Sequence, residues 1–383
     1  MNKKSIFIGL ALGSTWFGTH CGSGFATGAQ TNSFFVVFGA WGLITPIVAT
    51  AVMAVVAYFT WKFCYTFKTY NYREFSDALF KPYDKIFSNI YEILFLALMT
   101  MGMGSVFAGG GQLVSQVLNL PYMMGVLILS ACVFILTIFG SKVLLNSAAI
   151  LSIILVGTIT VVSVAGIAQN FDVFTRVVGN WETQGSLADA LWAALFYGAF
   201  QCIVLGATIA VTDSLKSDDD TKAGTWLGTL MNGAMMLILP MMLLCFYPGV
   251  TKEILPVLSA IQLTGIPFLT EAYSLMLFLA FVTTGISLIF SIVKRFEKYG
   301  ASFVPKVQTR RIIYSIMFLV ISFLISIAGL VAIVSKGYYA IGLLAFPCVV
   351  IPTLVVAPIK IRRKRAELSG LEQAPDTEAS QTA

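Results

Sequence analysis

The sequence predicts an all-α integral membrane protein of about ten transmembrane helices, arranged as two inverted repeats of five, with the first and sixth helices broken. Three observations support this prediction. The 383 residues are 58% hydrophobic and only 11% charged, whereas a soluble domain has roughly 25% charged residues. The apolar residues form long runs, each sufficient for a helix across a hydrocarbon core of about 30 Å. Glycines interrupt the first and the sixth run, which is typical of paired broken helices around a midplane site.

Each apolar run is predicted to be a helix, because lipid offers the backbone no hydrogen-bond partners and barrel strands would alternate in hydropathy. Residues 1–12 resemble a signal peptide, but no small-x-small cleavage site follows, so this run is kept as the first span. The segment from Thr251 to Gly265 is too short to span and is predicted to be an interfacial helix. The ten expected spans cover residues 5–36, 42–67, 86–117, 121–139, 142–168, 187–213, 222–248, 268–296, 310–334 and 338–359.

These spans divide the chain into four regions. We expect residues 1–168 to form the first five-helix repeat and residues 187–365 to form the second. Residues 169–186 are expected to be an extracellular connector between the repeats. Residues 366–383 are polar and are expected to be a disordered cytoplasmic tail.

Lysine and arginine are distributed unevenly between the two sides of this topology. With the N-terminus in the cytoplasm, the inner segments hold 21 of these residues and the outer segments hold 3, namely Arg176, Lys252 and Lys336. This bias predicts a multi-pass plasma-membrane protein whose N- and C-termini are both cytoplasmic. The cluster from Lys360 to Arg365 is interpreted as a topology anchor, with contact to anionic membrane lipids as the alternative. The net charge of +6 therefore reflects topology, and we expect no nucleic-acid partner.

Motifs for enzymatic chemistry, for disulfide frameworks and for zinc are not found in the sequence. The six cysteines contain no CxxC pair and are interpreted as small packing residues. No HExxH, P-loop or dinucleotide-binding motif is present. The acidic residues nearest to the membrane core are Glu92, Asp189, Asp213 and Glu271, each close to a predicted helix end. We therefore expect neither an enzyme nor a bound cofactor, apart from an inorganic ion considered below.

A glycine-rich segment, GTHCGSGFATGAQ from Gly18 to Gln30, lies in the first span. Glycine costs about 1 kcal/mol relative to alanine inside a helix, so this density of glycine predicts a helix break. Irregular backbone survives at membrane depth only where it lines a cavity or meets a ligand. Its free amides can hold a carboxylate and its carbonyls a cation. The alternative is close helix packing through small residues.

The sixth span carries the corresponding interruption. It contains Tyr197, Gly198 and Gln201 within an otherwise apolar run, and paired interruptions in the two halves point to a binding site. The alternative is that these polar side chains only join neighbouring helices. In the third span, Ser105 and Gln112 lie among small residues and could face the same cavity. The simpler alternative is that the glycines of this span only allow close helix packing.

In the eighth span, Ala280, Thr283 and Thr284 share one helix face, because residues three and four apart lie on the same side. One carbonyl and two hydroxyl groups there could coordinate a cation. The alternative is that the hydroxyl groups bond back to their own helix, as threonine commonly does.

His20 is the single histidine and lies inside the glycine-rich segment. Its ordinary pKa would suit a proton-coupling group, whereas the alternative is a neutral histidine with a structural hydrogen bond. Lys142 at the start of the fifth span could occupy a cation site as an ammonium group, but it is interpreted as reaching the cytoplasmic interface.

Together these features resemble the LeuT-type fold of the amino acid–polyamine–organocation transporters and the neurotransmitter:sodium symporters. The resemblance covers nearly the whole chain. In sequence, the chain resembles the YkvI-type bacterial membrane proteins, whose first span reads like GAGFASGQE. Here this stretch runs from Gly22 to Gln30, and the AGxG stretch of the third span matches Ala108 to Gly111. Where that pattern ends in Gln-Glu this chain has Ala29-Gln30, so the role of that glutamate is not carried over.

The resemblance implies two sets of binding residues. A sodium ion would be held by first-span carbonyl groups and by the eighth span, at Gly18, Cys21, Ala280, Thr283 and Thr284. The small-molecule substrate would be bound by Thr19, His20, Gly22, Ser23, Gly24, Phe25, Thr27, Ser105, Tyr197, Phe200 and Gln201.

Two functions are compatible with this reading. The first is a secondary active symporter of the bacterial plasma membrane, which carries a small neutral or zwitterionic solute, such as an amino acid or amine, with Na⁺ or H⁺ by alternating access. The scarcity of carboxylates in the membrane argues against a strongly cationic substrate. The alternative is a transporter-fold receptor that binds a small ligand without transporting it. The chain can work as a monomer, and nothing in the sequence requires a dimer.

Overall fold

The computed structural model describes residues 3–139, 141–296 and 299–372. Within these residues the chain is helical, and the only strand-like pairing is an isolated bridge between Gly39 and Thr183. Seven of the described helices are long and apolar enough to cross a membrane by themselves. The other three predicted spans are the broken first span, a shorter fourth helix, and a fifth helix that continues after a 74° bend.

The first half of the chain follows the predicted order of helices. Three short helices, α1 (Lys3–His20), α2 (Ser23–Ala26) and α3 (Ala29–Phe34), make up the first span. Two short 3₁₀ turns, Val36–Phe38 and Ala40–Leu43, lead to the second span. The remaining helices are α4 (Thr45–Phe67), the amphipathic α5 (Tyr72–Phe80), α6 (Asp84–Leu118), α7 (Tyr122–Phe139), α8 (Ser141–Gln169) and α9 (Phe171–Gly179) in the connector.

The second half contains α10 (Leu187–Thr208), which continues as a 3₁₀ segment, Ile209–Ser214. It is followed by α11 (Asp218–Leu244) and by a 3₁₀ turn, Gly249–Lys252. The short helix α12 (Pro256–Leu263) lies where the interfacial helix was predicted. The last helices are α13 (Pro267–Phe296), α14 (Val307–Ser326), α15 (Leu330–Ala332), α16 (Tyr339–Ala345) and α17 (Ile351–Glu372), with π-helical stretches Ile333–Tyr338 and Phe346–Val350 between the last three.

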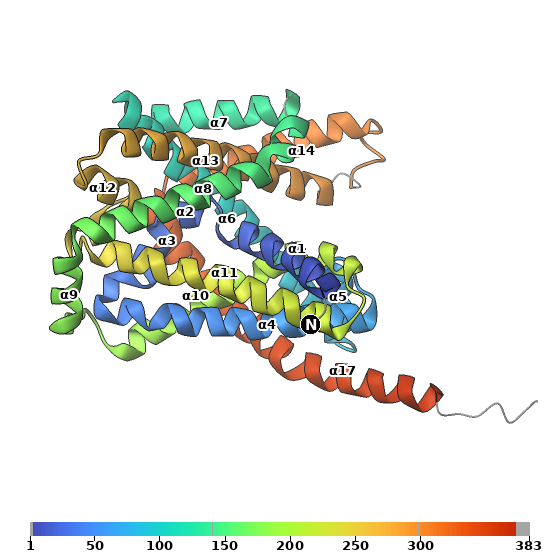
Figure 1. The fold of residues 1–383 in the computed structure, drawn as a ribbon. Helices are drawn as coiled ribbons and strands as arrows, with labels where there is room; N and C mark the ends of the chain where they lie inside the picture. The colour runs from blue at the N-terminus through green and yellow to red at the C-terminus, as the bar shows by residue number, and fades with distance from the viewer. Residues whose placement is uncertain (1–2, 140, 297–298, 373–383) are drawn as a thin grey trace, which may run out of the picture.

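The helices form two groups that lie side by side (Figure 1). One group consists of α1, α4, α10 and α11, and the other consists of α6, α7, α13 and α14. Helix α8 contacts both α11 and α13, and α16 packs on α10. Small residues bring α1 and α11 into backbone contact, since a methyl group added at Gly13 would lie 2.8 Å from the Gly228 amide nitrogen. Such close packing is the usual means of helix association in a bilayer.

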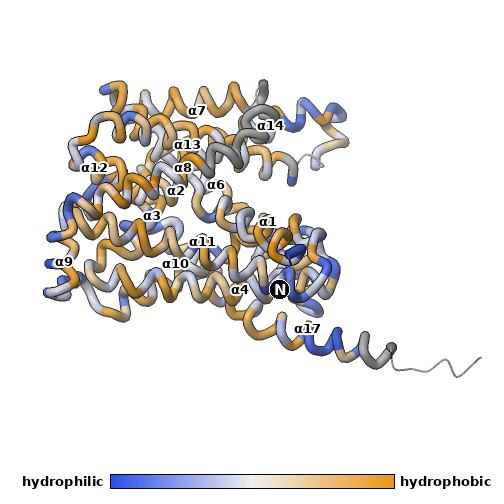
Figure 2. The backbone as a smooth tube through the Cα atoms, viewed as in Figure 1, coloured by the Kyte–Doolittle hydropathy of each residue, from blue (hydrophilic) through white to orange (hydrophobic). Residues whose placement is uncertain are grey.

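The N-terminus and the far end of α17 lie at the same end of the molecule, while α9 and α12 lie at the other (Figure 1). Hydrophilic residues gather on α5, on the outer turns of α17 and on α9, outside the apolar bodies of the helices (Figure 2). We refer to the two ends as the terminus end and the α12 end. This placement is compatible with the predicted even number of spans.

Ion pairs fasten the helices to one another at the terminus end. The Glu92 carboxylate of α6 accepts hydrogen bonds from Arg73 Nη1 of α5, at 2.7 Å, and from Arg295 Nε of α13, at 2.8 Å. The Asp218 carboxylate at the start of α11 pairs with Arg365 of α17 and lies 3.9 Å from Lys62 Nζ. These contacts tie the extramembrane part of α17 to the group of helices around α11.

The predicted break in the sixth span is wrong, because α10 is a continuous α-helix from Leu187 to Thr208. A Cβ atom at Gly198 would lie 3.2 Å from the Ala49 carbonyl oxygen of α4. This glycine therefore allows close packing between two helices, and no second glycine stands beside it to open the backbone.

The predicted boundary between the ninth and tenth spans is also wrong. The chain turns at residues 327–329, where Gly329 has a φ of 81°, and the last span begins at Leu330. The predicted loop at 335–337 is instead π-helical. Residues 366–372 of the predicted tail continue α17, and residues 373–383 lie outside the described part of the chain.

Candidate functional site

The break in the first span is confirmed. Helix α1 ends at His20, and α2 supplies a single turn before Gly28 adopts a φ of 79°. Two carbonyl groups released by the break are used by other helices. Thr27 O accepts the Val257 amide of α12 at 3.1 Å, and Ala26 O accepts the Tyr273 hydroxyl of α13. The irregular backbone is thus held by neighbours and does not face lipid, as the bilayer requires.

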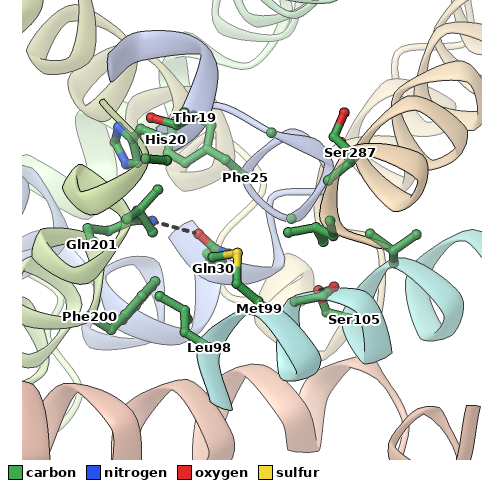
Figure 3. Close-up of a pocket in the computed structure, with 18 of the residues that line it drawn as sticks. Thr19, His20, Phe25, Gln30, Leu98, Met99, Ser105, Phe200, Gln201 and Ser287 are labelled. Atoms are coloured by element: carbon green, nitrogen blue, oxygen red, sulfur yellow. Dashed lines mark hydrogen bonds between the residues drawn. The ribbon is translucent and has the colours of Figure 1, made fainter. Parts of the chain in front are cut away.

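A cavity of about 320 Å³ lies at this break, between the two groups of helices (Figure 3). Phe25, Gln30, Leu98, Met99 and Phe200 converge on its centre in Figure 3. None of the described residues that line it is Asp, Glu, Lys or Arg. The cavity therefore offers backbone groups, hydroxyl groups, side-chain amides and apolar surface, but no counter-charge.

Most of the predicted site residues are brought together here. From the predicted set, the cavity is lined by Gly18, Thr19, His20, Gly22, Gly24, Phe25, Ser105, Phe200, Gln201, Thr283 and Thr284.

Four predicted residues do not line the cavity. Cys21 and Ala280 are buried, and Thr27 is buried with its hydroxyl group donating to Gly24 O at 2.9 Å. Tyr197 is fully buried behind His20. Tyr197 was predicted to contact the substrate directly, but its hydroxyl group contacts His20 instead. The side chain of Ser23 lies outside the described part of the structure.

His20 is held by hydrogen bonds on both ring nitrogens. Its Nδ1 lies 2.6 Å from Asn232 Oδ1 of α11, and its Nε2 lies 2.8 Å from the Tyr197 hydroxyl of α10. Asn232 Nδ2 donates to Gly228 O at 2.7 Å, which leaves Asn232 Oδ1 as an acceptor. A neutral imidazole with its proton on Nδ1 fits both contacts, because it donates to Asn232 and accepts from Tyr197 through Nε2. These contacts favour the alternative that His20 is a neutral histidine with a structural role. Its ring joins α1, α10 and α11.

The hydroxyl groups of Thr283 and Thr284 in the eighth span differ in their surroundings. Thr283 Oγ1 donates to Leu279 O at 2.9 Å and to Ala280 O at 3.2 Å, so the back-bonding alternative holds for this residue. Thr284 faces the break, since a methyl group at Gly22 would lie 3.9 Å from Thr284 Oγ1. A threonine hydroxyl that donates to a carbonyl keeps lone pairs for a cation.

Several lining residues were not predicted from the sequence. Gln201 Nε2 donates to Gln30 Oε1 at 3.4 Å, so Gln30 from beyond the break reaches α10 (Figure 3). Tyr338 comes from the π-helical stretch of the last span. Its hydroxyl oxygen lies 2.8 Å from Ser105 Oγ, and its ring stacks on Phe200. The remaining unpredicted lining residues are Leu98, Met99, Gly102, Val106, Val204, Ala207, Ser287, Leu288 and Ser291.

The cavity extends toward the terminus end and is covered at the α12 end. On α13 it follows Thr284, Ser287 and Ser291, and on α10 it reaches Ala207. At the α12 end, Asn32 Nδ2 of α3 donates to Thr251 O at 3.1 Å. A Cβ atom at Gly28 would lie only 2.7 Å from Val257 Cγ2, so α12 presses directly on the first span.

No family model matches the chain, and no curated protein matches it by sequence. Solved structures do match over almost the whole length. A Na⁺-coupled sialic acid symporter, in a substrate-bound outward-open state, is 15% identical with a TM-score of 0.61, covering 92% of this chain and 90% of that chain. The manganese transporter of Eremococcus coleocola is 11% identical with a TM-score of 0.59, covering 97% and 89%. Mhp1 in its inward-facing conformation is 14% identical with a TM-score of 0.57, covering 95% and 91%.

These similar proteins carry an organic acid in one case and a metal ion in another, so the shared architecture does not name a substrate. It does define the fold. The chain has the LeuT-type fold, with a broken first span against a second group of helices.

Proposed function

We propose that this protein is a secondary active symporter, which carries a small neutral or zwitterionic solute, such as an amino acid or amine, with Na⁺ or H⁺. The observation that supports the proposal most directly is the uncharged cavity at the helix break, enclosed by residues of both helix groups. A solute held there would be desolvated by apolar walls and oriented by a few polar groups, as in most small-molecule sites.

The asymmetry of the cavity supports alternating access. The α12 end is closed by the contact of α12 with Thr27 and by the contact of the 3₁₀ turn Gly249–Lys252 with Asn32, while the cavity extends along α13 toward Ser291. By the positive-inside rule the terminus end is cytoplasmic, and the protein is a multi-pass protein of the bacterial plasma membrane. The structure then corresponds to a state closed to the outside. Rocking of the helix group around α11 would open the other side and release α12 from the first span.

The roles of individual residues follow from their positions. The turn formed by Gly22 and Gly24 would offer amide donors to a carboxylate of the solute. Gln201 and Ser105 would orient its polar groups, and Phe25 and Phe200 would cover its apolar part. In this proposal His20 and Tyr197 position α1 and α10 behind the site.

Sodium is the favoured coupling ion. The Gly18 and Cys21 carbonyl groups and the Ala280, Thr283 and Thr284 oxygens would coordinate it, in keeping with the sodium coupling of the sialic acid symporter. Proton coupling at His20 is less favoured, because both ring nitrogens already bond to neutral partners. A transition-metal cargo is not supported, since no cluster of three or more His, Cys, Asp or Glu side chains occurs in the described part of the chain.

The test is solute counterflow in liposomes containing the purified protein. We expect labelled solute to accumulate against an unlabelled pool, faster in sodium than in potassium. Thermal unfolding with a panel of amino acids and amines would first identify a solute that binds, because a ligand of the folded state raises its stability. Binding without counterflow in any ion would reject the transporter and favour the receptor.

A further inference from the structure

We propose that Gln30 and Gln201 form an amide pair that selects solutes carrying an amide group, that is, a carbonyl acceptor beside an N–H donor. Primary carboxamides, ureides and lactams have this group. The proposal rests on the function proposed above and narrows its substrate class. We refer to these two side chains as the amide pair.

The amide pair lies at the junction of the broken span and the continuous one. Gln30 is in α3, just beyond the break, and Gln201 is in the middle of α10. The two residues are 6% and 4% exposed, and both line the cavity. Their side chains meet at 3.4 Å between Gln201 Nε2 and Gln30 Oε1 (Figure 3).

This contact leaves one donor group and one acceptor free. Gln30 Nε2 and Gln201 Oε1 have no hydrogen-bond partner among the described residues, and both belong to side chains that line the cavity. If both amides were turned over, the free atoms would be Gln201 Nε2 and Gln30 Oε1, which are again a donor and an acceptor. A solute that presents both an acceptor and a donor can satisfy both atoms, and an amide group does so.

The contact within the pair is long. Its separation of 3.4 Å exceeds the usual range of about 2.7–3.2 Å for an N–H···O bond. The same Gln201 Nε2 also lies 3.4 Å from the Tyr197 hydroxyl. The two amides can therefore shift slightly toward a solute amide while they stay in contact with each other.

The surroundings favour a neutral polar group over a charged one. Phe25, Leu98, Met99 and Phe200 supply the apolar walls near the pair, and the described lining has no charged side chain. A carboxylate in place of the solute amide would face Gln201 Oε1 with no donor of its own. Buried polar atoms left unpaired in this way are costly, which is the basis of selection by hydrogen bonding.

Gly24 lies against the pair. A Cβ atom at this position would lie 2.7 Å from Gln30 Nε2, so a larger residue would require the Gln30 amide to shift from its position at the break. The glycine-rich segment therefore serves the position of one specific side chain as well as the backbone.

The experiment is a series of binding measurements on the unmodified protein in detergent. Binding of each probe is measured as a rise in the temperature of thermal unfolding. The probes are L-glutamine, L-asparagine and 2-pyrrolidinone. Each is compared with the derivative in which the amide nitrogen is fully methylated. L-methionine serves as an apolar analogue of L-glutamine. We expect an amide probe to bind at least about tenfold more tightly than its fully N-methylated derivative, because one or two hydrogen bonds are lost. Equal binding of the two, or stabilisation by L-methionine and by no amide, would overturn the proposal.

Two variants then assign the selectivity to the pair. Gln30→Met and Gln201→Met keep the side-chain length and remove the amide, and each should abolish the preference for the amide probe over its N-methylated derivative. Gln184→Met, at an exposed position of the connector, is the control and should keep the preference. Unfolding temperatures without ligand show whether each variant folds. A preference that survives both cavity substitutions would exclude the amide pair.

Failure of this inference is distinguishable from failure of the proposed function. Counterflow of a solute without an amide group would reject the amide pair and retain the symporter. Selective binding of an amide without counterflow would retain the amide pair and reject the symporter.

Discussion

The Nε2 atom of His20 lies 2.8 Å from the Tyr197 hydroxyl, so the last helical turn before the break is tied to the middle of α10. On its other side the imidazole donates to Asn232 Oδ1 at 2.6 Å. The three side chains come from three different spans, and each is buried. They hold the edge of the cavity in place without contributing a charge to it.

Substitution of Asn232 by leucine should destabilise the protein. It would leave the His20 Nδ1–H donor buried without an acceptor, at a cost of about 1–3 kcal/mol. Thermal unfolding in detergent measures this loss. Asn180→Leu, at an exposed position after α9, is the control. An unfolding temperature for Asn232→Leu equal to that of the control would show that the hydrogen bond is not needed.

Substitution of Thr284 by alanine should weaken sodium dependence. Loss of one oxygen contact to a cation should raise the sodium concentration for half-maximal stabilisation roughly tenfold, as for a lost charge-assisted contact. Thr283→Ala should have a smaller effect, because its hydroxyl group already donates within its own helix. Unchanged sodium dependence in Thr284→Ala would remove the eighth span from the proposed ion site.

Substitution of Gly28 by alanine should loosen the closed α12 end. The residue has a φ of 79°, and its Cβ would collide with Val257 of α12. We expect a lower unfolding temperature, reflecting a loss of at least about 1 kcal/mol. Gly249→Ala is the control, because nothing lies within 4 Å of a Cβ atom there. Equal unfolding temperatures for the two variants would contradict the tight contact between the first span and α12.

Substitution of Glu92 by glutamine should lower the stability of the protein, because it weakens the ion pairs at the terminus end. Its carboxylate joins Arg73 of α5 and Arg295 of α13, and all three side chains are partly exposed. Partial solvent screening limits the expected loss to about 1–2 kcal/mol. Asp219→Asn, which removes an exposed pair with Lys222, is the control and should change the unfolding temperature little. A high-salt buffer should reduce the difference between the two variants.

The break of the first span could be predicted from the sequence because its cause is local. Several glycines among small polar residues weaken a helix whatever its neighbours are. The break between α1 and α2, and the left-handed turn at Gly28, fall within the predicted segment. The helices that surround the cavity were likewise predictable, since a run of apolar residues in lipid has one stable backbone arrangement.

The two wrong predictions concern the sixth span and the start of the last span, where contacts with other helices determine the backbone structure. Gly198 belongs to the predicted interruption of the sixth span, but it packs against the Ala49 carbonyl, and a sequence does not distinguish a glycine that breaks a helix from one that lets two helices pack closely. Lys336 and Gly337 resembled a loop, yet the last span passes through them as a π-helix. This shift of the span placed Tyr338 in the cavity wall, so its role was missed together with the boundary.

Within the site, most of the cation and substrate residues implied by the resemblance line one cavity, but their contacts with one another could not be predicted. Gln30 follows two interruptions of the helix after His20, and its side-chain direction depends on the backbone at both. The Asn232 contact with His20 joins positions more than two hundred residues apart. Pattern and spacing carry no information about such pairs.

The absence of charged side chains from the described cavity lining has an electrical consequence. A membrane potential acts on charge that moves through the field, at about 2.3 kcal/mol per elementary charge for each 100 mV. If the cavity changes its exposure from one side to the other, the lining carries no net charge of its own across the field. The return of the empty cavity should then move no charge, so the voltage dependence of transport should lie in the step that carries the ion and the solute.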